Sequence, residues 1–220
     1  MARAKQELNM TEGPFLGKLI RFTIPVILTG LLQTFYNAAD LAVVGSFRGE
    51  IALAAVGCTG SLTNLSVNLF MGLSVGAGVV VAHQLGAGER DRVEKTVHSS
   101  LLLAALLGVF AAIGGFCAAE TLLRLIDTPE SVLPFATRYL RIIFIGMPAN
   151  MIYNYAAAMV RSTGDTKRPL IFLSVSGLVN VALNLLFIAG FGMGVEGVAI
   201  ATIVSQYLSA VMILTFMARS

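Results

Sequence analysis

A single carboxylate, Asp40, lies at the end of a long uncharged segment and is well placed for ion chemistry inside a membrane. No charged residue occurs between Arg21 and Asp40. A charged side chain in lipid is costly, so such a carboxylate is a functional candidate. Gln33 and Asn37 precede Asp40 on the same helix face. A rise of about 1.5 Å per residue places Asp40 roughly 30 Å from Arg21. The alternative to a functional site inside the membrane is therefore a solvent-exposed position at the outer membrane interface.

Polar side chains at helical spacing recur in four further hydrophobic segments. Any one pair could join two helices by a hydrogen bond worth about 1 kcal/mol, and this is the favoured interpretation for the first pair below. Together with Asp40, however, they predict a bundle whose interior is polar enough to hold water, an ion or a solute. The residues are Asn64 and Asn68, Asn150 and Asn154, Asn180 and Asn184, and Thr202, Ser205 and Ser209.

Catalytic patterns are not found in the sequence. His83 and His98 flank a polar loop without the spacing of metal ligands. No phosphate-binding GxxxxGK[ST] loop occurs, and no serine has a visible base. Cys58 and Cys117 lie in apolar segments, which favours a packing role over a disulfide or a metal. We therefore expect no enzyme, no cofactor, and no metal other than a monovalent Na⁺ at Asp40.

The elements that position these residues are predicted from the gaps between charges. The chain is 56% hydrophobic and 12% charged, with a mean hydropathy of +0.83, whereas soluble domains carry about 25% charged residues. Six uncharged gaps approach or exceed the roughly 20 residues that cross a bilayer. The prediction is an all-α integral membrane protein, with a polar segment over 1–15 and a six-helix bundle over 16–220. Its helices are expected at about 16–44, 51–82, 96–119, 134–160, 170–190 and 196–217.

The basic residues are distributed unequally between alternate loops. Eleven fall in the two terminal segments and the loops on the same side, against four on the other side. Because cytoplasmic loops collect Lys and Arg, both termini are expected in the cytoplasm, with the first helix retained as an anchor. This distribution explains the net charge of +3 without a nucleic-acid partner.

Pro25 interrupts the first predicted helix fifteen residues before Asp40. Proline removes one backbone hydrogen bond and bends a helix. The kink is either fixed or a hinge whose angle responds to the charge on Asp40.

Short motifs along nearly the whole chain resemble the amino-terminal lobe of the MATE (multidrug and toxin extrusion) transporters. Each piece is short, but their order and spacing are specific. The matching pieces are Ile24-Pro25, Tyr36-Asn-Ala-Ala-Asp40-Leu-Ala-Val-Val-Gly45, Ala55-Val-Gly57, Gly86-Ala-Gly88, Tyr139-Leu-Arg141, Arg161-Ser-Thr-Gly-Asp165 and Gly194-Val-Glu-Gly-Val-Ala-Ile-Ala-Thr202.

The resemblance implies secondary active efflux of cationic or amphipathic compounds in exchange for sodium ions or protons, at the cell membrane. It implies two six-helix lobes, so this chain would need a second homologous lobe in addition to membrane lipids and small organic cations as partners. Some relatives have Asp at the position of Asn184, so this lobe suits one monovalent cation better than two. The implied cation site comprises Asp40, Asn180, Asn184 and Thr202, with Gln33, Tyr36, Asn37, Tyr139 and Asn154 in or near the cavity.

Two other functions remain open at this stage. A lipid-linked oligosaccharide flippase of the same superfamily would usually need a more cationic cavity, and the membrane-facing positions here lack internal Arg or Lys. A structural membrane subunit without transport activity would tolerate replacement of Asp40 by Asn.

Overall fold

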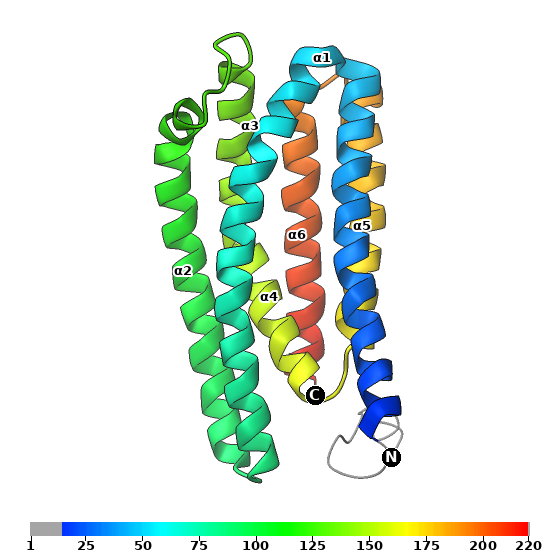
Figure 1. The fold of residues 1–220 in the computed structure, drawn as a ribbon, viewed down its shortest axis with the longest axis vertical. Coiled ribbons are helices and arrows are strands. Elements are labelled where there is room, and N and C mark those ends of the chain that lie inside the picture. The colour runs from blue at the N-terminus through cyan, green and yellow to red at the C-terminus, as the bar shows by residue number, and fades with distance from the viewer. Residues whose placement is uncertain (1–14, 220) are drawn as a thin grey trace.

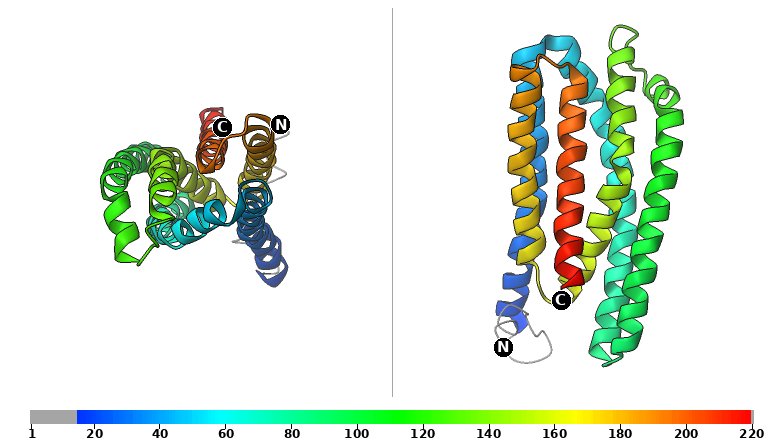
Figure 2. Two further views of the ribbon diagram at one scale, coloured as in Figure 1. Left: turned by 90° about the horizontal axis from the view of Figure 1, so that it is seen from above. Right: turned by 180° about the vertical axis from the view of Figure 1, so that it is seen from behind.

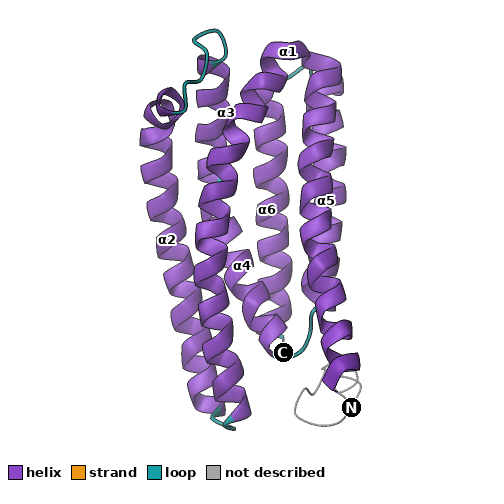
Figure 3. Ribbon diagram, viewed as in Figure 1, coloured by secondary structure: helices purple, strands orange, loops and turns teal. Residues whose placement is uncertain are grey.

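The computed structural model describes residues 15–219, which form a bundle of helices along one long axis (Figure 1). Within that range the chain has helices, short loops and no strand (Figure 3). The elements are α1 (Phe15–Gly86), α2 (Arg90–Leu125), α3 (Leu133–Ile145), α4 (Met147–Ser162), α5 (Lys167–Leu185), the π-helical turn η2 (Leu186–Gly190) and α6 (Val195–Ala218). The all-α prediction is confirmed. The terminal segment expected over 1–15 lies almost wholly outside the described residues.

Helix α1 consists of two limbs that meet at Gly49. The glycine has φ 78° and ψ −173°, a conformation that a residue with a Cβ rarely adopts. The ribbon rises to this point and then descends, so the two limbs cross the long axis in opposite directions (Figure 1). The segments expected over 16–44 and 51–82 fall in the first and second limb. Arg48, next to this turn, connects it to η2, since its Nη2 atom donates to the Ile188 carbonyl at 3.1 Å.

Helices α3 and α4 form one bent pass, expected from the sequence as the single helix 134–160. Their axes differ by 47° at a break at Gly146. Pro148 follows the break and cannot donate a backbone hydrogen bond. Gly146 has no room for a Cβ, because the side chains of Gln206 and Ile203 occupy that space. The break is therefore built into the packing against α6.

Among the described residues, four helices are long and apolar enough to cross a membrane, or five when α3 and α4 count as one bent span. One of the five, α1, reverses at Gly49 and so contributes two passes, which gives the six-pass bundle. Many large apolar side chains point outward, including Phe110 and Leu178 at 72% and 68% exposure. Such a surface suits lipid rather than water.

Helices α2 and α6 run past both ends of the expected segments 96–119 and 196–217, whereas the expected segment 170–190 is divided between α5, which ends at Leu185, and η2. Helix α2 begins at Arg90 and so includes charged residues that precede the expected start at residue 96. Helices α5 and α6 lie side by side (Figure 2). Small residues allow close packing elsewhere: Gly108 of α2 lies against Pro148, and Gly115 against the ring of Phe144. These contacts hold the bent pass against α2.

Candidate functional site

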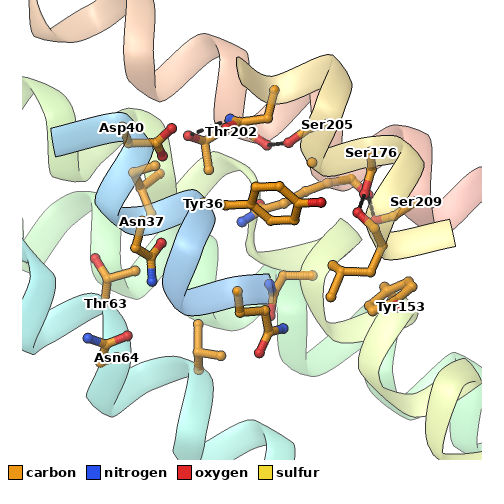
Figure 4. A pocket seen from close by; sticks show the side chains of 18 of the residues that line it. Tyr36, Asn37, Asp40, Thr63, Asn64, Tyr153, Ser176, Thr202, Ser205 and Ser209 are labelled. Carbon is orange, nitrogen blue, oxygen red and sulfur yellow. Dashed lines mark hydrogen bonds between the residues drawn. The ribbon is translucent and has the colours of Figure 1, made fainter. Parts of the chain in front are cut away.

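A polar pocket of about 280 Å³ lies inside the bundle, between the two limbs of α1 and helices α3 to α6 (Figure 4). It collects side chains that are far apart in the sequence. Most of the residues predicted from the polar stripes or implied by the family resemblance line it, Asn154 and Asn184 excepted: Gln33, Tyr36, Asn37, Asp40, Asn64, Asn68, Tyr139, Asn150, Asn180, Thr202, Ser205 and Ser209.

Asp40 lies at one end of a chain of hydrogen-bonded amide and hydroxyl groups. It is 6% exposed, and the Asn184 amide donates a hydrogen bond to its carboxylate. The same amide nitrogen lies 3.3 Å from the Asn180 Oδ1 atom, and the Asn180 amide donates to the Thr202 hydroxyl at 3.4 Å. The structure thus brings together the four residues predicted as a cation site, from α1, α5 and α6.

The oxygen atoms of this cluster suit a small, hard cation. The Asn184 Oδ1 atom is fully buried and has no hydrogen-bond partner among the described residues. A buried polar atom without a partner is costly, so an acceptor left free at this point favours a bound donor or cation. Carboxylate and carbonyl oxygens are the usual ligands of hard cations.

Asp40 is the only formally charged side chain among the described residues that line the pocket. No group of three or more His, Cys, Asp or Glu that could hold a metal ion occurs in residues 15–219. The pocket therefore combines one negative charge with neutral amides, hydroxyls and aromatic rings. That combination is suited to binding a monovalent cation or an organic cation.

Tyr36 connects α1 to α5 through the middle of the pocket. Its hydroxyl donates to the Ser174 carbonyl at 3.2 Å. Its ring lies against Gly177, where a Cβ would overlap the ring atoms. The absence of a side chain at Gly177 therefore allows Tyr36 its position beside Asp40.

Asn154 is the predicted cavity residue that does not line the pocket. It is 5% exposed, and its amide donates to both the carbonyl and the Oδ1 atom of Asn150, each at 2.9 Å. Asn150 lines the pocket in its place. Asn154 is therefore near the cavity and orients a residue that faces it.

Pro25, predicted as a hinge, is buried within the first limb of α1. The hydroxyl of Thr29 donates to the Pro25 carbonyl at 2.8 Å, a bond that commonly accompanies helix bending. The two cysteines are free and stand apart from the pocket.

Sequence reasoning missed several pocket residues that the structure adds. Ser176 lies four residues before Asn180 and continues its stripe, so the spacing could have revealed it. Thr63, Tyr153 and Gln206 line the pocket as well. Tyr153 lies three residues after Asn150, and this helical spacing could have indicated that the two side chains share a face.

Comparisons with known proteins place this geometry among transporters. The MatE family model matches residues 25–186. The chain is 32% identical over 198 residues to a protein of Bacillus subtilis (strain 168) named "Probable multidrug resistance protein YpnP", covering 90% of this chain and 44% of the relative. It is 30% identical over 213 residues to "Probable multidrug resistance protein NorM" of Thermotoga maritima, covering 94% and 45%. The chain thus spans less than half the length of these relatives.

A solved structure supports the same comparison. "Crystal structure of MATE in the bent conformation" superposes with a TM-score of 0.84 and 28% sequence identity, over 89% of this chain and 44% of that one. The fold of one half of that protein is therefore shared by this chain.

Proposed function

This chain belongs to the MatE family, and we propose that it is the amino-terminal half of a transporter that expels cationic or amphipathic compounds in exchange for sodium ions or protons. The observation that carries the proposal is the placement of Asp40. It is the one charged side chain among the pocket residues that the structure describes, and amides and hydroxyls from α5 and α6 surround it.

A cation at Asp40 would neutralise the carboxylate. Na⁺ would be held by Asp40, by the free oxygen of Asn184 and by the oxygens of Asn180 and Thr202. A proton would act on Asp40 alone and would turn the carboxylate into a donor. In either case the burial of the pocket becomes less costly, so occupancy of Asp40 would favour a different state of the lobe from the empty site.

The membrane potential supplies the driving force for this exchange. A cation that moves inward across the membrane gains about 2.3 kcal/mol per 100 mV. If the organic cation and the coupling cation compete for the negative pocket, inward movement of one drives outward movement of the other. Pro25 is our candidate for the bend that converts occupancy at Asp40 into a movement of the first limb of α1.

A second lobe is part of the proposal. The relatives are about twice the length of this chain, and residues of both limbs of α1 line the pocket. We infer that a homologous six-helix lobe, in the same polypeptide or a partner, completes the substrate cleft. We place the assembly in the cell membrane with both termini in the cytoplasm, because the basic residues predominate on that side.

The other functions fit the pocket less well. A flippase for lipid-linked oligosaccharides binds an anionic substrate, and no Lys or Arg is among the described residues that line the pocket. A structural subunit would not need a buried carboxylate with a free acceptor beside it. The relatives of the family are transporters rather than enzymes.

Gradient-driven efflux tests the proposal. The chain, joined to its second lobe, is reconstituted in proteoliposomes loaded with a fluorescent organic cation. An inward gradient of Na⁺ or of protons is then imposed without ATP. We expect efflux that follows one of the two gradients and stops when that gradient is collapsed by an ionophore. Efflux that ignores both gradients would refute antiport, and transport of a lipid-linked sugar instead would favour the flippase.

A further inference from the structure

The hydroxyl groups of the pocket are nearly all used as donors within the protein. Nine lining residues carry a hydroxyl, and seven of them donate its hydrogen to a backbone carbonyl, the described exceptions being Thr63 and Tyr139. A hydroxyl has one hydrogen and two lone pairs. What these groups offer to an occupant is therefore acceptor oxygen, which suits a cation and disfavours an anion.

Three of these hydroxyls form a recess away from Asp40. Tyr153 of α4 donates to the Pro169 carbonyl at 2.8 Å, Ser176 of α5 to the Leu173 carbonyl at 3.0 Å, and Ser209 of α6 to the Gln206 carbonyl at 2.8 Å. All three residues are buried, at 5%, 3% and 4% exposure respectively. We call Tyr153, Ser176 and Ser209 the inner recess.

The inner recess is separate from the cluster around Asp40. On α5 it lies eight residues before Asn184, and on α6 seven residues after Thr202. At 1.5 Å per residue these separations are about 12 Å and about 10 Å. On both helices the recess residues lie on the same side of the Asp40 cluster, toward the loop between α4 and α5 (Figure 2).

Tyr36 stands between the two groups. Figure 4 draws its ring with Asp40 and Thr202 on one side and Ser176, Ser209 and Tyr153 on the other. Its ring touches Gly177, the neighbour of Ser176. Tyr153 lines the far end of the pocket, where its bond to Pro169 ties α4 to the first turn of α5. The pocket is therefore one polar path with a carboxylate in one half and neutral oxygens in the other.

We propose that Tyr153, Ser176 and Ser209 form a second, weaker station for the coupling cation, on a path inside the lobe that leads from Asp40 past Tyr36 toward the loop between α4 and α5. The station has no formal charge, so it would hold a monovalent cation briefly and pass it on. This inference rests on the proposed function, since it names the route by which the cation exchanged at Asp40 travels.

Silver ion provides a small monovalent probe of this path. In a background in which Cys58 and Cys117 are replaced by Ala, a cysteine is placed at Ser209 or, in a second variant, at Ser176. The full chain in membranes is exposed to Ag⁺, denatured, and labelled with a maleimide to count the thiols that remain free. The matched control is Ala210→Cys, because Ala210 neighbours Ser209, is equally buried at 4% exposure, and packs in the apolar core instead of lining the pocket.

We expect Ag⁺ to block Ser209→Cys and Ser176→Cys at least tenfold faster than Ala210→Cys, and excess Na⁺ or acid to slow the reaction at least threefold. Blocking of both thiols no faster than that of Ala210→Cys, or rates that neither Na⁺ nor acid changes, would overturn the second station. Gradient-driven efflux distinguishes a failure of the second station from a failure of the proposed function. Efflux that requires Asp40 while Ag⁺ fails to reach the recess would refute the station alone, whereas absence of gradient-driven efflux would refute the proposed function.

Discussion

Asp40 and Asn184 lie 144 residues apart in the chain, and the Asn184 amide donates a hydrogen bond directly to the Asp40 carboxylate. This contact joins the first limb of α1 to α5 inside the bundle. Asn184 is fully buried, and its own oxygen has no partner in residues 15–219. The pair thus combines a stabilised charge with an unused acceptor, which is the arrangement that the proposed cation exchange requires.

Replacement of Asn184 by Leu removes the donor and leaves the carboxylate buried without it. An unsatisfied buried group costs about 1–3 kcal/mol, and more for a charged one, so we expect a loss of at least that size in the free energy of unfolding. The measurement is thermal stability in detergent, followed by size-exclusion chromatography. In the Asp40→Asn background the loss should be smaller, because the two residues interact. Equal losses in both backgrounds would show that the hydrogen bond contributes nothing to stability.

Substitution of Gly177 by Ala should displace Tyr36. A Cβ at this position would overlap the tyrosine ring, and overpacking of a core costs about 1–3 kcal/mol. We expect lower thermal stability and impaired efflux. Gly114→Ala is the control, since nothing lies within 4 Å of a Cβ there. A Gly177→Ala protein as stable as that control would contradict the close packing of Tyr36 on α5.

Pro25→Ala tests the hinge. Alanine restores the backbone donor that proline lacks, and so permits a regular helix through this turn. We expect efflux to fall several-fold while Ag⁺ still reaches Ser209→Cys at the same Na⁺-sensitive rate, because the cation site itself is intact. Unchanged efflux would reduce Pro25 to a fixed kink without a role in transport.

The ion pair between Arg138 and Glu196 should matter little to stability. It joins α3 to α6 at 2.9 Å, with 64% of the arginine side chain and 26% of the glutamate side chain exposed. Pairs of this kind contribute about 0–1 kcal/mol and weaken with salt. Arg138→Gln is therefore expected to shift the melting temperature by no more than a few degrees, with the shift shrinking in high salt. A large, salt-independent loss would indicate that the pair holds the lobe in one conformation.

Hydrophobic spacing predicted the helices well, because a membrane imposes a length on each apolar segment. It did not predict that the first two helices form one continuous element, since the turn depends on the positive φ of Gly49. Gly146 and Pro148 lie inside the predicted helix 134–160 and mark a weak point there, but the sequence does not show a bend. The bend follows from the packing of Gln206 and Ile203 against Gly146, a contact between segments that periodicity cannot show.

The residues of the pocket, like the helices, were predicted in large part but not completely. Amides and hydroxyls three or four residues apart indicated which helix faces are polar, and the structure brings these faces together. Asn154 lay on a predicted face, but its side chain turns back to Asn150. Tyr153 lies between Asn150 and Asn154 in the sequence, but its place in the pocket depends on the orientation of α4 after the break. Whether such side chains face the pocket can be determined only from the tertiary structure.

Efflux by the Asp40→Asn variant tests the central claim most directly. The chain joined to its second lobe is compared with this variant in the gradient-driven assay, and Asp127→Asn is the control, because Asp127 follows α2 and stands outside the pocket. We predict that a folded Asp40→Asn protein loses gradient-driven efflux by at least tenfold while Asp127→Asn retains it. Unchanged efflux with unchanged ion dependence would contradict the account and would place the coupling group outside this chain.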